Sequence, residues 1–375
     1  MDYNIYSLQV QDSEAVALTT DGSPLRRRYE WPTWSHSGQL AYFCCNGQAS
    51  IDVFISDDGS TQGESVYTGQ GEAFTYASWS PSVCSTGDEP CYDLGVLISN
   101  LVNGQFDVRL LNADNASTTL IGSGAPFYFS WSPDGQRLLT YRNETSLDIY
   151  QVAEGNLSPI ELQPGTFPAP AWSPVDDRLL VGTVSADGQS TDLVVISDGE
   201  TQTLAENLNG QVVFNWSPDG NYVAYSTLFQ NQVDLLYVVD AISGEVVAQT
   251  NFDSTFAFFW SPDSSKLAYL TSGVPQGSFS AKQQASGIAW GILDVTTDTT
   301  WRYGSFLPTR EMVYMISFFN QFAQSHQIWS PDSSHIVFAE QISNGQASLN
   351  ILDVTRVNSL PLFIGEGYIG IWSYE

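Results

Sequence analysis

One short motif recurs along the entire chain and constrains its fold more than any other feature. The stretch FNWSPDGNYVAYS begins at Phe214, and close copies begin at Phe129, Phe258 and Gln327. A repeat of this kind has to be explained first, because it determines the whole architecture. Looser copies complete the series, so that a Trp-Ser pair begins at Trp34, Trp79, Trp131, Trp172, Trp216, Trp260, Trp329 and Trp372.

Each repeat has the pattern of four short strands. In residues 212–250, VVFNWS alternates and is rich in β-branched and aromatic residues, as a strand requires. SPDG then supplies Pro, Asp and Gly at successive turn positions, which favours a tight hairpin turn. NYVAYST, VDLLYVVD and VVAQT provide three more strands. Four antiparallel strands per repeat predict the blades of a β-propeller, with each Trp-Ser pair on an innermost strand and its ring packed between blades.

The count of repeats predicts an all-β fold, a single closed β-propeller domain over residues 1–375. Seven complete units begin at the first seven Trp-Ser pairs, and GYIGIWS near the C-terminus adds one more innermost strand. NIYSLQV and AVALTT near the N-terminus match a third and a fourth strand. We therefore expect eight four-stranded blades, one of them a composite of both termini, since this closure removes free sheet edges. A seven-bladed ring is the alternative.

The charge balance excludes several classes of partner. The chain has 12 basic and 41 acidic residues, a net charge of -29. Nucleic acid and anionic membrane surfaces both need clustered positive charge, so neither is an expected partner. The sequence has no apolar run long enough to insert into a membrane. Residues 1–18 lack the features of a signal peptide, so we expect any targeting segment to lie outside this chain.

The cysteines point to an oxidising compartment. Cys84 and Cys91 bracket the short polar loop STGDEP and are expected to form a disulfide, whereas Cys44 and Cys45 are adjacent on a predicted strand. Four cysteines permit three pairings, and four free thiols are the alternative.

The WSPDG hairpin with its following strands resembles the TolB-type, WD40-like β-propeller repeat, and the resemblance covers essentially the whole chain. This family includes periplasmic proteins and the propeller domains of peptidases. The resemblance implies a periplasmic or extracellular, non-catalytic scaffold that binds a protein or another ligand. The alternative is a propeller enzyme, or an enzyme-associated domain, that processes sugars or peptides.

A search for catalytic motifs finds none. The sequence lacks a G-x-S-x-G elbow, an HExxH motif, a Cys-x-x-Cys pair and a glycine-rich phosphate loop. The only histidines are His36, His326 and His335. We therefore name no catalytic residue and expect no cofactor; a calcium site built from loop carboxylates is left open.

A series of acids occupies equivalent positions in five repeats. Each acid stands at the start of the predicted third strand, so a closed ring would arrange them in an annulus that attracts cations or basic partners. The alternative is that each carboxylate accepts hydrogen bonds within its own loop. The series is Asp52, Asp107, Asp148, Asp192 and Asp234.

Two long insertions mark the expected binding face. Residues 272–287 connect a second to a third strand and residues 304–327 connect two blades, so both should emerge on one face for a protein or glycan ligand. The basic cluster Arg26, Arg27 and Arg28 also lies in a blade-to-blade connection and could hold an anionic group. We expect Tyr314, Phe318 and His326 to form the binding surface. Helical spacing in the second insertion predicts one short helix, serving either as a plug or as a wall of the site, with Met312, Met315, Ile316, Phe319 and Phe322 on one side.

Overall fold

The computed structural model describes residues 2–10, 15–45, 50–82, 84, 91–229, 232–251, 254–272, 287–342 and 345–374. The chain divides into two compact units, Met1–Ile160 with Ser373–Glu375, and Glu161–Trp372. Antiparallel sheets make up most of both units.

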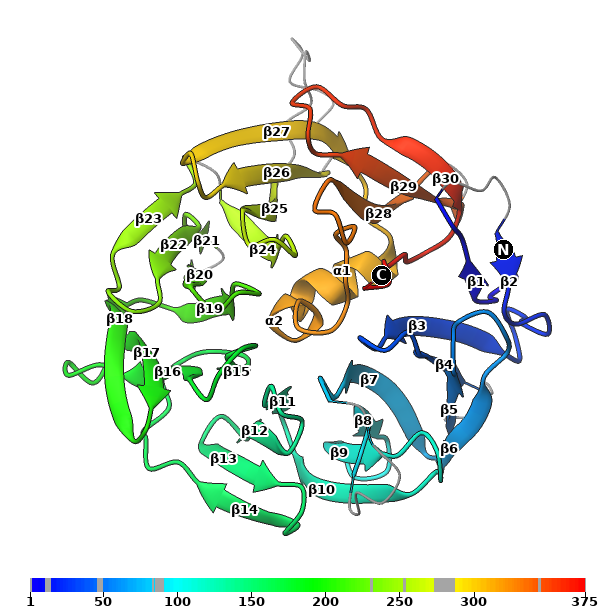
Figure 1. The fold of residues 1–375 in the computed structure, drawn as a ribbon, viewed down its shortest axis with the longest axis horizontal. Helices are drawn as coiled ribbons and strands as arrows, with labels where there is room; N and C mark the ends of the chain where they lie inside the picture. Colours follow the sequence, from blue (N-terminus) through cyan, green and yellow to red (C-terminus); the bar gives the residue numbers. More distant parts are fainter. Residues whose placement is uncertain are drawn as a thin grey trace. The chain divides into compact units, whose positions relative to one another are not determined.

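The first unit contains three four-stranded sheets and one two-stranded sheet. Within each four-stranded sheet every strand pairs with its neighbours in sequence (Figure 1). The strands are β1 (Tyr6–Ser7), β2 (Val16–Ala17), β3 (Arg28–Trp34), β4 (Leu40–Cys45), β5 (Ser50–Ser56), β6 (Glu64–Gln70), β7 (Glu72–Trp79), β8 (Leu94–Asn100), β9 (Gln105–Leu111), β10 (Thr118–Gly124), β11 (Phe127–Trp131), β12 (Arg137–Arg142), β13 (Ser146–Gln151) and β14 (Asn156–Pro159).

The second unit contains four more sheets and two helices. One sheet carries the extra short strand β21 (Gln232–Val233), and the last sheet has three described strands. The other elements are β15 (Ala171–Trp172), β16 (Leu179–Val184), β17 (Thr191–Ser197), β18 (Glu200–Leu208), β19 (Gln211–Trp216), β20 (Tyr222–Phe229), β22 (Tyr237–Asp240), β23 (Val246–Gln249), β24 (Thr255–Trp260), β25 (Lys266–Ser272), β26 (Ile288–Asp294), β27 (Thr299–Phe306), α1 (Arg310–Ser317), α2 (Phe319–Phe322), β28 (His335–Gln341), β29 (Ala347–Asp353) and β30 (Leu362–Glu366).

The expected all-β propeller fold is confirmed, with seven blades, and the expectation of eight is wrong. β1 pairs with β2, Tyr6 opposite Ala17, but these strands join no larger sheet in the described part of the chain. Residues 367–374 form no strand, so Trp372 does not lie on an innermost strand. Gly367 N–H still donates to the Ala347 carbonyl of β29 at 3.2 Å, and Trp372 N–H donates to the Gln327 carbonyl at 2.7 Å, but these separate bonds build no ladder. Gly370 lies closely against the side chains of Val337 and Leu349, where a strand with side chains at that position would not fit.

The repeated turn is held by its own serine and aspartate. Ser217 Oγ donates to Asp219 at 2.6 Å, and Gly220 takes a φ of +69°, a left-handed conformation that favours glycine. Serine stands at the glycine position in the next two blades, where Ser264 and Ser333 both have a φ of +59°. The Ser264 hydroxyl accepts from the backbone N–H of Asp219 at 3.1 Å, so the strained residue also joins two blades.

The repeated tryptophans link neighbouring blades. Six of them end the innermost strands β3, β7, β11, β15, β19 and β24, and Trp329 makes an isolated bridge to Ile336. Four indole N–H groups donate to the backbone carbonyl just before the tryptophan of the preceding blade. These bonds are Trp79 to Thr33 (2.9 Å), Trp131 to Ser78 (3.1 Å), Trp216 to Ala171 (3.3 Å) and Trp329 to Phe259 (3.0 Å).

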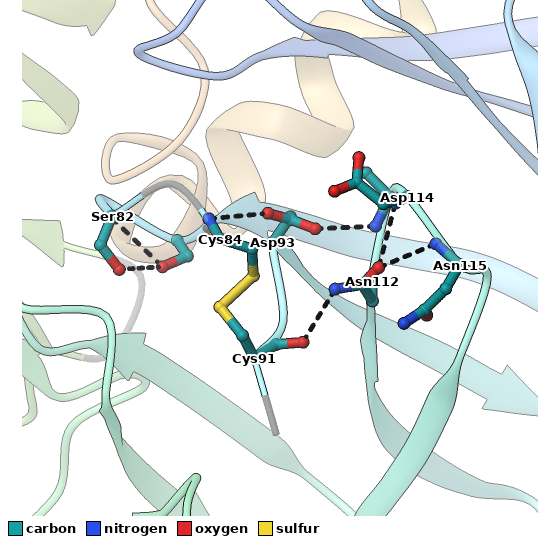
Figure 2. Close-up of a disulfide and its surroundings, with 9 residues drawn as sticks. Ser82, Cys84, Cys91, Asp93, Asn112, Asp114 and Asn115 are labelled. Carbon is teal, nitrogen blue, oxygen red and sulfur yellow. Dashed lines mark hydrogen bonds between the residues drawn. A yellow bond between two sulfur atoms is a disulfide. The ribbon is translucent and has the colours of Figure 1, made fainter. Parts of the chain in front are cut away.

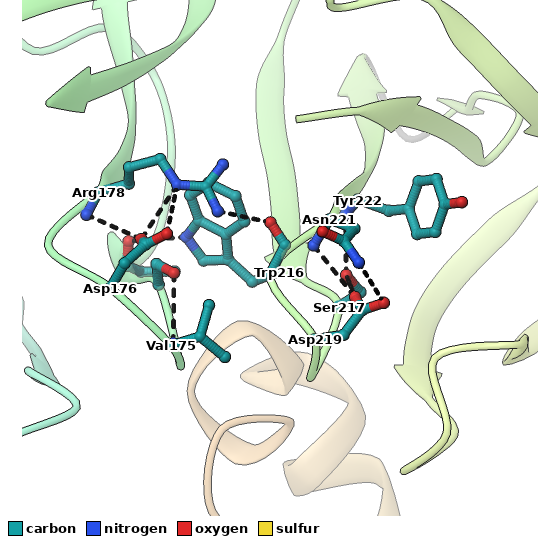
Figure 3. A network of polar contacts seen from close by, with 11 residues as sticks. Val175, Asp176, Arg178, Trp216, Ser217, Asp219, Asn221 and Tyr222 are labelled. Carbon is teal, nitrogen blue, oxygen red and sulfur yellow. Dashed lines mark hydrogen bonds and ion pairs between the residues drawn. The ribbon is translucent and has the colours of Figure 1, made fainter. Parts of the chain in front are cut away.

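Arg178 strengthens one of these junctions. Its guanidinium lies 4.8 Å from the centre of the Trp216 ring and donates to the Gly220 carbonyl at 2.6 Å (Figure 3). Asp176 accepts from Arg178 Nε at 2.9 Å and fixes its orientation. Arg178, in the hairpin of one blade, thereby contacts both the tryptophan and the hairpin of the next blade.

Replacing Trp216 with phenylalanine tests the blade-to-blade bond. Trp216→Phe removes the indole donor and leaves the buried Ala171 carbonyl without it, so we expect a loss of about 2 kcal/mol in the free energy of unfolding. Urea unfolding followed by circular dichroism measures this loss. Trp301→Phe is the control, because Trp301 Nε1 donates to Tyr303 within the same outer strand. Equal losses in the two variants would show that the inter-blade bond has no special role.

Candidate functional site

The helical insertion is fixed firmly to the second unit. α1 and α2 contact the innermost strands β24 and β19 respectively, and Figure 1 shows both helices beside these strands. Asn320 Nδ2 donates to the Phe214 carbonyl at 3.0 Å, and Phe319 packs edge-on against Phe258 at 4.9 Å between ring centres. Met312 and Phe322 are also buried. The underside of the insertion is therefore part of the core.

The sequence predicted one helix in this insertion, whereas the structure has two. Phe318, with φ -122° and ψ 30°, separates α1 from α2. α1 begins at a capped end, where the Thr309 hydroxyl accepts from the Met312 N–H at 3.2 Å. Thr309 also donates to the Tyr368 carbonyl, which holds the start of the helix in place.

The outer side of the insertion exposes apolar side chains. Val313 is 47 % exposed and Phe318 is 41 % exposed, and Tyr314 packs against Phe318 at 5.0 Å between ring centres. Leu307 just before α1 is exposed as well. We name Leu307, Val313, Tyr314 and Phe318 the apolar platform.

His326 lies beneath this platform and not on the surface. It is 2 % exposed, and its ring packs edge-on against Phe322 at 4.8 Å between ring centres. Nδ1 shares a 2.8 Å hydrogen bond with the Ser325 hydroxyl. Burial lowers the pKa of His326 from 6.5 to about 3, so the imidazole is neutral at physiological pH. Phe318 is exposed and Tyr314 packs against it, whereas His326 is buried on the core side of the insertion.

The three arginines have different environments within the first unit. Arg27 pairs with Asp21 and lies over the rings of Tyr29 and Phe54. Arg28 is exposed, with its guanidinium 4.9 Å from the centre of the Tyr3 ring. Arg26 is exposed in the turn before β3. Their role as an anchor for an anionic group stays a prediction.

The carboxylates of the acidic series accept hydrogen bonds from their own blades. Four of the acids lie in third strands, and Asp234 lies just before β22. Three of these bonds tie the third strand to a neighbouring strand, whereas Asp192 accepts from the β16–β17 connection and Asp234 from the next residue. The bonds agree with the local interpretation; the acidic annulus stays a prediction. The donors are Thr68 for Asp52 (2.7 Å), Ser123 for Asp107 (2.5 Å), Arg142 for Asp148 (2.9 Å), Ser185 for Asp192 (2.5 Å) and the Leu235 N–H for Asp234 (2.8 Å).

A disulfide joins Cys84 and Cys91, with 5.7 Å between their Cα atoms. Figure 2 shows Asp93 beside it, accepting from the backbone N–H of Cys84 at 3.4 Å and of Ala113 at 2.7 Å. Burial raises the pKa of Asp93, although these two hydrogen bonds act in the opposite direction. This buried carboxylate belongs to no repeated motif, and the sequence did not predict it.

A small polar cavity between the hairpins of the first two blades was also missed. Its lining includes Ser35, His36, Ser80, Ser82 and Asp93. The signal was present in the repeat itself, since serine replaces the turn aspartate in both of these hairpins. With that carboxylate missing, the two serine hydroxyls of the second hairpin face each other at 3.3 Å.

Neither a metal-binding cluster nor a membrane-spanning helix occurs in the described ranges. In this part of the chain no three His, Cys, Asp or Glu side chains are grouped so that they could hold a metal ion. None of its helices is both long enough and apolar enough to cross a membrane. The first long insertion, residues 272–287, lies outside the described residues except for Ser272 and Gly287.

Comparison with known proteins identifies the fold. No family model matches the chain, and no curated protein matches it in sequence. A structure from a study of two prolyl endopeptidases is similar at a TM-score of 0.60 and 9 % identity, over 90 % of this chain and 50 % of the other. An oligogalacturonate lyase in complex with manganese is similar at a TM-score of 0.54 and 12 % identity, over 93 % of this chain and 96 % of the lyase. TolB from Acinetobacter baumannii has a TM-score of 0.42 and 14 % identity, over 91 % of this chain and 79 % of TolB. The first two likenesses show a shared fold.

Burial of His326 predicts a dependence of stability on pH. The unfolded chain takes up a proton below pH 6.5, whereas the folded chain resists protonation down to about pH 3. Above pH 6.5 the buried neutral imidazole makes its full contribution to the free energy of unfolding. This contribution decreases by about 1.4 kcal/mol per pH unit as the pH falls toward 3. Urea unfolding of His326→Gln should therefore show a correspondingly shallower loss between pH 6.5 and 5. Parallel curves for the parent and His326→Gln would contradict the assignment.

Proposed function

We propose that this propeller is a non-catalytic binding scaffold, acting in the periplasm or outside the cell, that recognises a protein partner through the apolar platform. One observation carries the proposal. The same short insertion buries one side against innermost strands and exposes Val313 and Phe318 on the other. Exposed apolar groups on a rigid support are typical of protein interaction sites.

The anchoring of the insertion supports a preorganised surface. Gln324 Nε2 donates to the Pro170 carbonyl and Asn320 donates to the Phe214 carbonyl, so the segment is tied to two blades besides its contact with β24. The platform side chains consequently lose little conformational freedom when a partner binds, which favours affinity.

The disulfide and the excess of acids support the proposed location and a basic partner. A disulfide between Cys84 and Cys91 is stable in an oxidising compartment, in agreement with the periplasm or the exterior. A net charge of -29 would accelerate association with a basic partner and oppose nucleic acid.

Phe318→Asp tests the platform, because it places a charge in the proposed contact without removing a buried side chain. We expect this variant to capture the partner from the native envelope fraction at least tenfold less well than the parent, in a pull-down quantified by mass spectrometry. Val102→Asp is the matched control, since Val102 is 86 % exposed in the β8–β9 turn of the first unit. Both variants should keep the circular dichroism spectrum of the parent.

Two results would contradict the proposal. Equal loss of capture in the Phe318→Asp and Val102→Asp variants would attribute the effect to added charge alone. Turnover of oligogalacturonides or of prolyl peptides by the purified parent would show an enzyme in place of a non-catalytic scaffold.

A further inference from the structure

The outermost strand of the last blade has an unusual surface. β30 pairs with β29 on one side, and no described strand pairs with its other side. Leu360, Leu362 and Phe363 are 86 %, 63 % and 59 % exposed. An outer strand with unpaired backbone groups and exposed apolar side chains is a ready template for another strand.

The other outer strands of the second unit provide an internal comparison. β18 exposes mainly polar residues, including Glu200 and Glu206, and the exposed residues of β27 are Thr299, Gly304 and Ser305. β23 exposes Val246 and Val247, at 54 % and 38 %, but the exposed acid Glu245 comes directly before them. Charged and polar residues are the usual protection of sheet edges, and β30 lacks this protection over its first residues.

The charge of the chain decides what kind of strand fits. A second copy would bring another net charge of -29 to this edge, which opposes pairing of two copies. The exposed acid Glu366 ends β30, and a partner strand with Lys or Arg at its ends would reduce the charge on both sides. We propose that the free edge of β30 binds an extended apolar segment of a partner protein, flanked by basic residues, which adds to the sheet as a further strand.

Recognition in this arrangement has two parts. Main-chain hydrogen bonds to the β30 backbone give affinity, and contacts with Leu362 and Phe363 select apolar side chains. The basic ends add an attraction that salt screens. This edge is a different surface from the apolar platform, so the two proposals can fail separately.

A designed peptide tests the edge directly. The probe is a fluorescein-labelled seven-residue peptide of alternating Val and Thr with Lys at both ends, titrated against the full chain by fluorescence anisotropy. We expect saturable binding that weakens at least tenfold in Phe363→Ser and in Leu362→Ser, and that weakens between 50 and about 500 mM salt. Val246→Ser on β23 is the matched control and should bind like the parent.

Three outcomes would overturn the proposal. One is that the same peptide with Glu at both ends binds as tightly as the peptide with Lys. Another is that Val246→Ser weakens peptide binding as much as Phe363→Ser does. The third is a dimer in sedimentation experiments that Phe363→Ser converts to a monomer, because the occupant of the edge would then be a second copy of the chain. If the peptide did not bind but the platform still captured its partner, only the proposal for β30 would fail.

Discussion

The bond between one tryptophan indole and the backbone of the preceding blade is the interaction on which the rest of the structure depends. Each blade is a small sheet that cannot bury both faces alone, so its stability comes from neighbours. The indole fills the space between two sheets, and its N–H donates to a backbone carbonyl of the preceding blade, as from Trp131 to Ser78 at 3.1 Å. One side chain thereby provides packing and orientation together at the four junctions where this bond forms.

This dependence makes departures from the repeat informative. Where the turn keeps its Asp, the serine hydroxyl is occupied, as in the 2.5 Å bond from Ser330 to Asp332. Where serine replaces the Asp, as at Ser82, the hydroxyls line the polar cavity beside Asp93 instead. The longest departure, the insertion with α1 and α2, contributes the apolar platform. The regular residues build the support, and the irregular ones provide the surfaces that could distinguish this propeller from others.

Much of the fold could be predicted from the sequence, because hairpin chemistry and alternation are local signals. WSPDG places a strand end, a turn and a strand start within a few residues, and the structure has them there. The number of blades could not be predicted in the same way. The apolar residues near Trp372 resemble a strand, but whether they form a ladder depends on tertiary contacts such as the close approach of Gly370 to Val337 and Leu349. The break at Phe318 and the burial of His326 also depend on what lies beneath the insertion.

The scarcity of basic residues connects the interior to the surfaces. Arg109 pairs with Glu72, Arg142 with Asp148, and Arg178 with Asp176, so part of the limited positive charge neutralises acids at least half buried within blades. Exposed acids are left largely uncompensated, and they repel further copies of the chain as well as anionic surfaces. Under that constraint, contact surfaces have to be locally neutral and apolar to bind at close range, while the surrounding field favours basic partners. The platform around Phe318 and the edge around Phe363 both meet this requirement, and they do so on different elements of one compact unit.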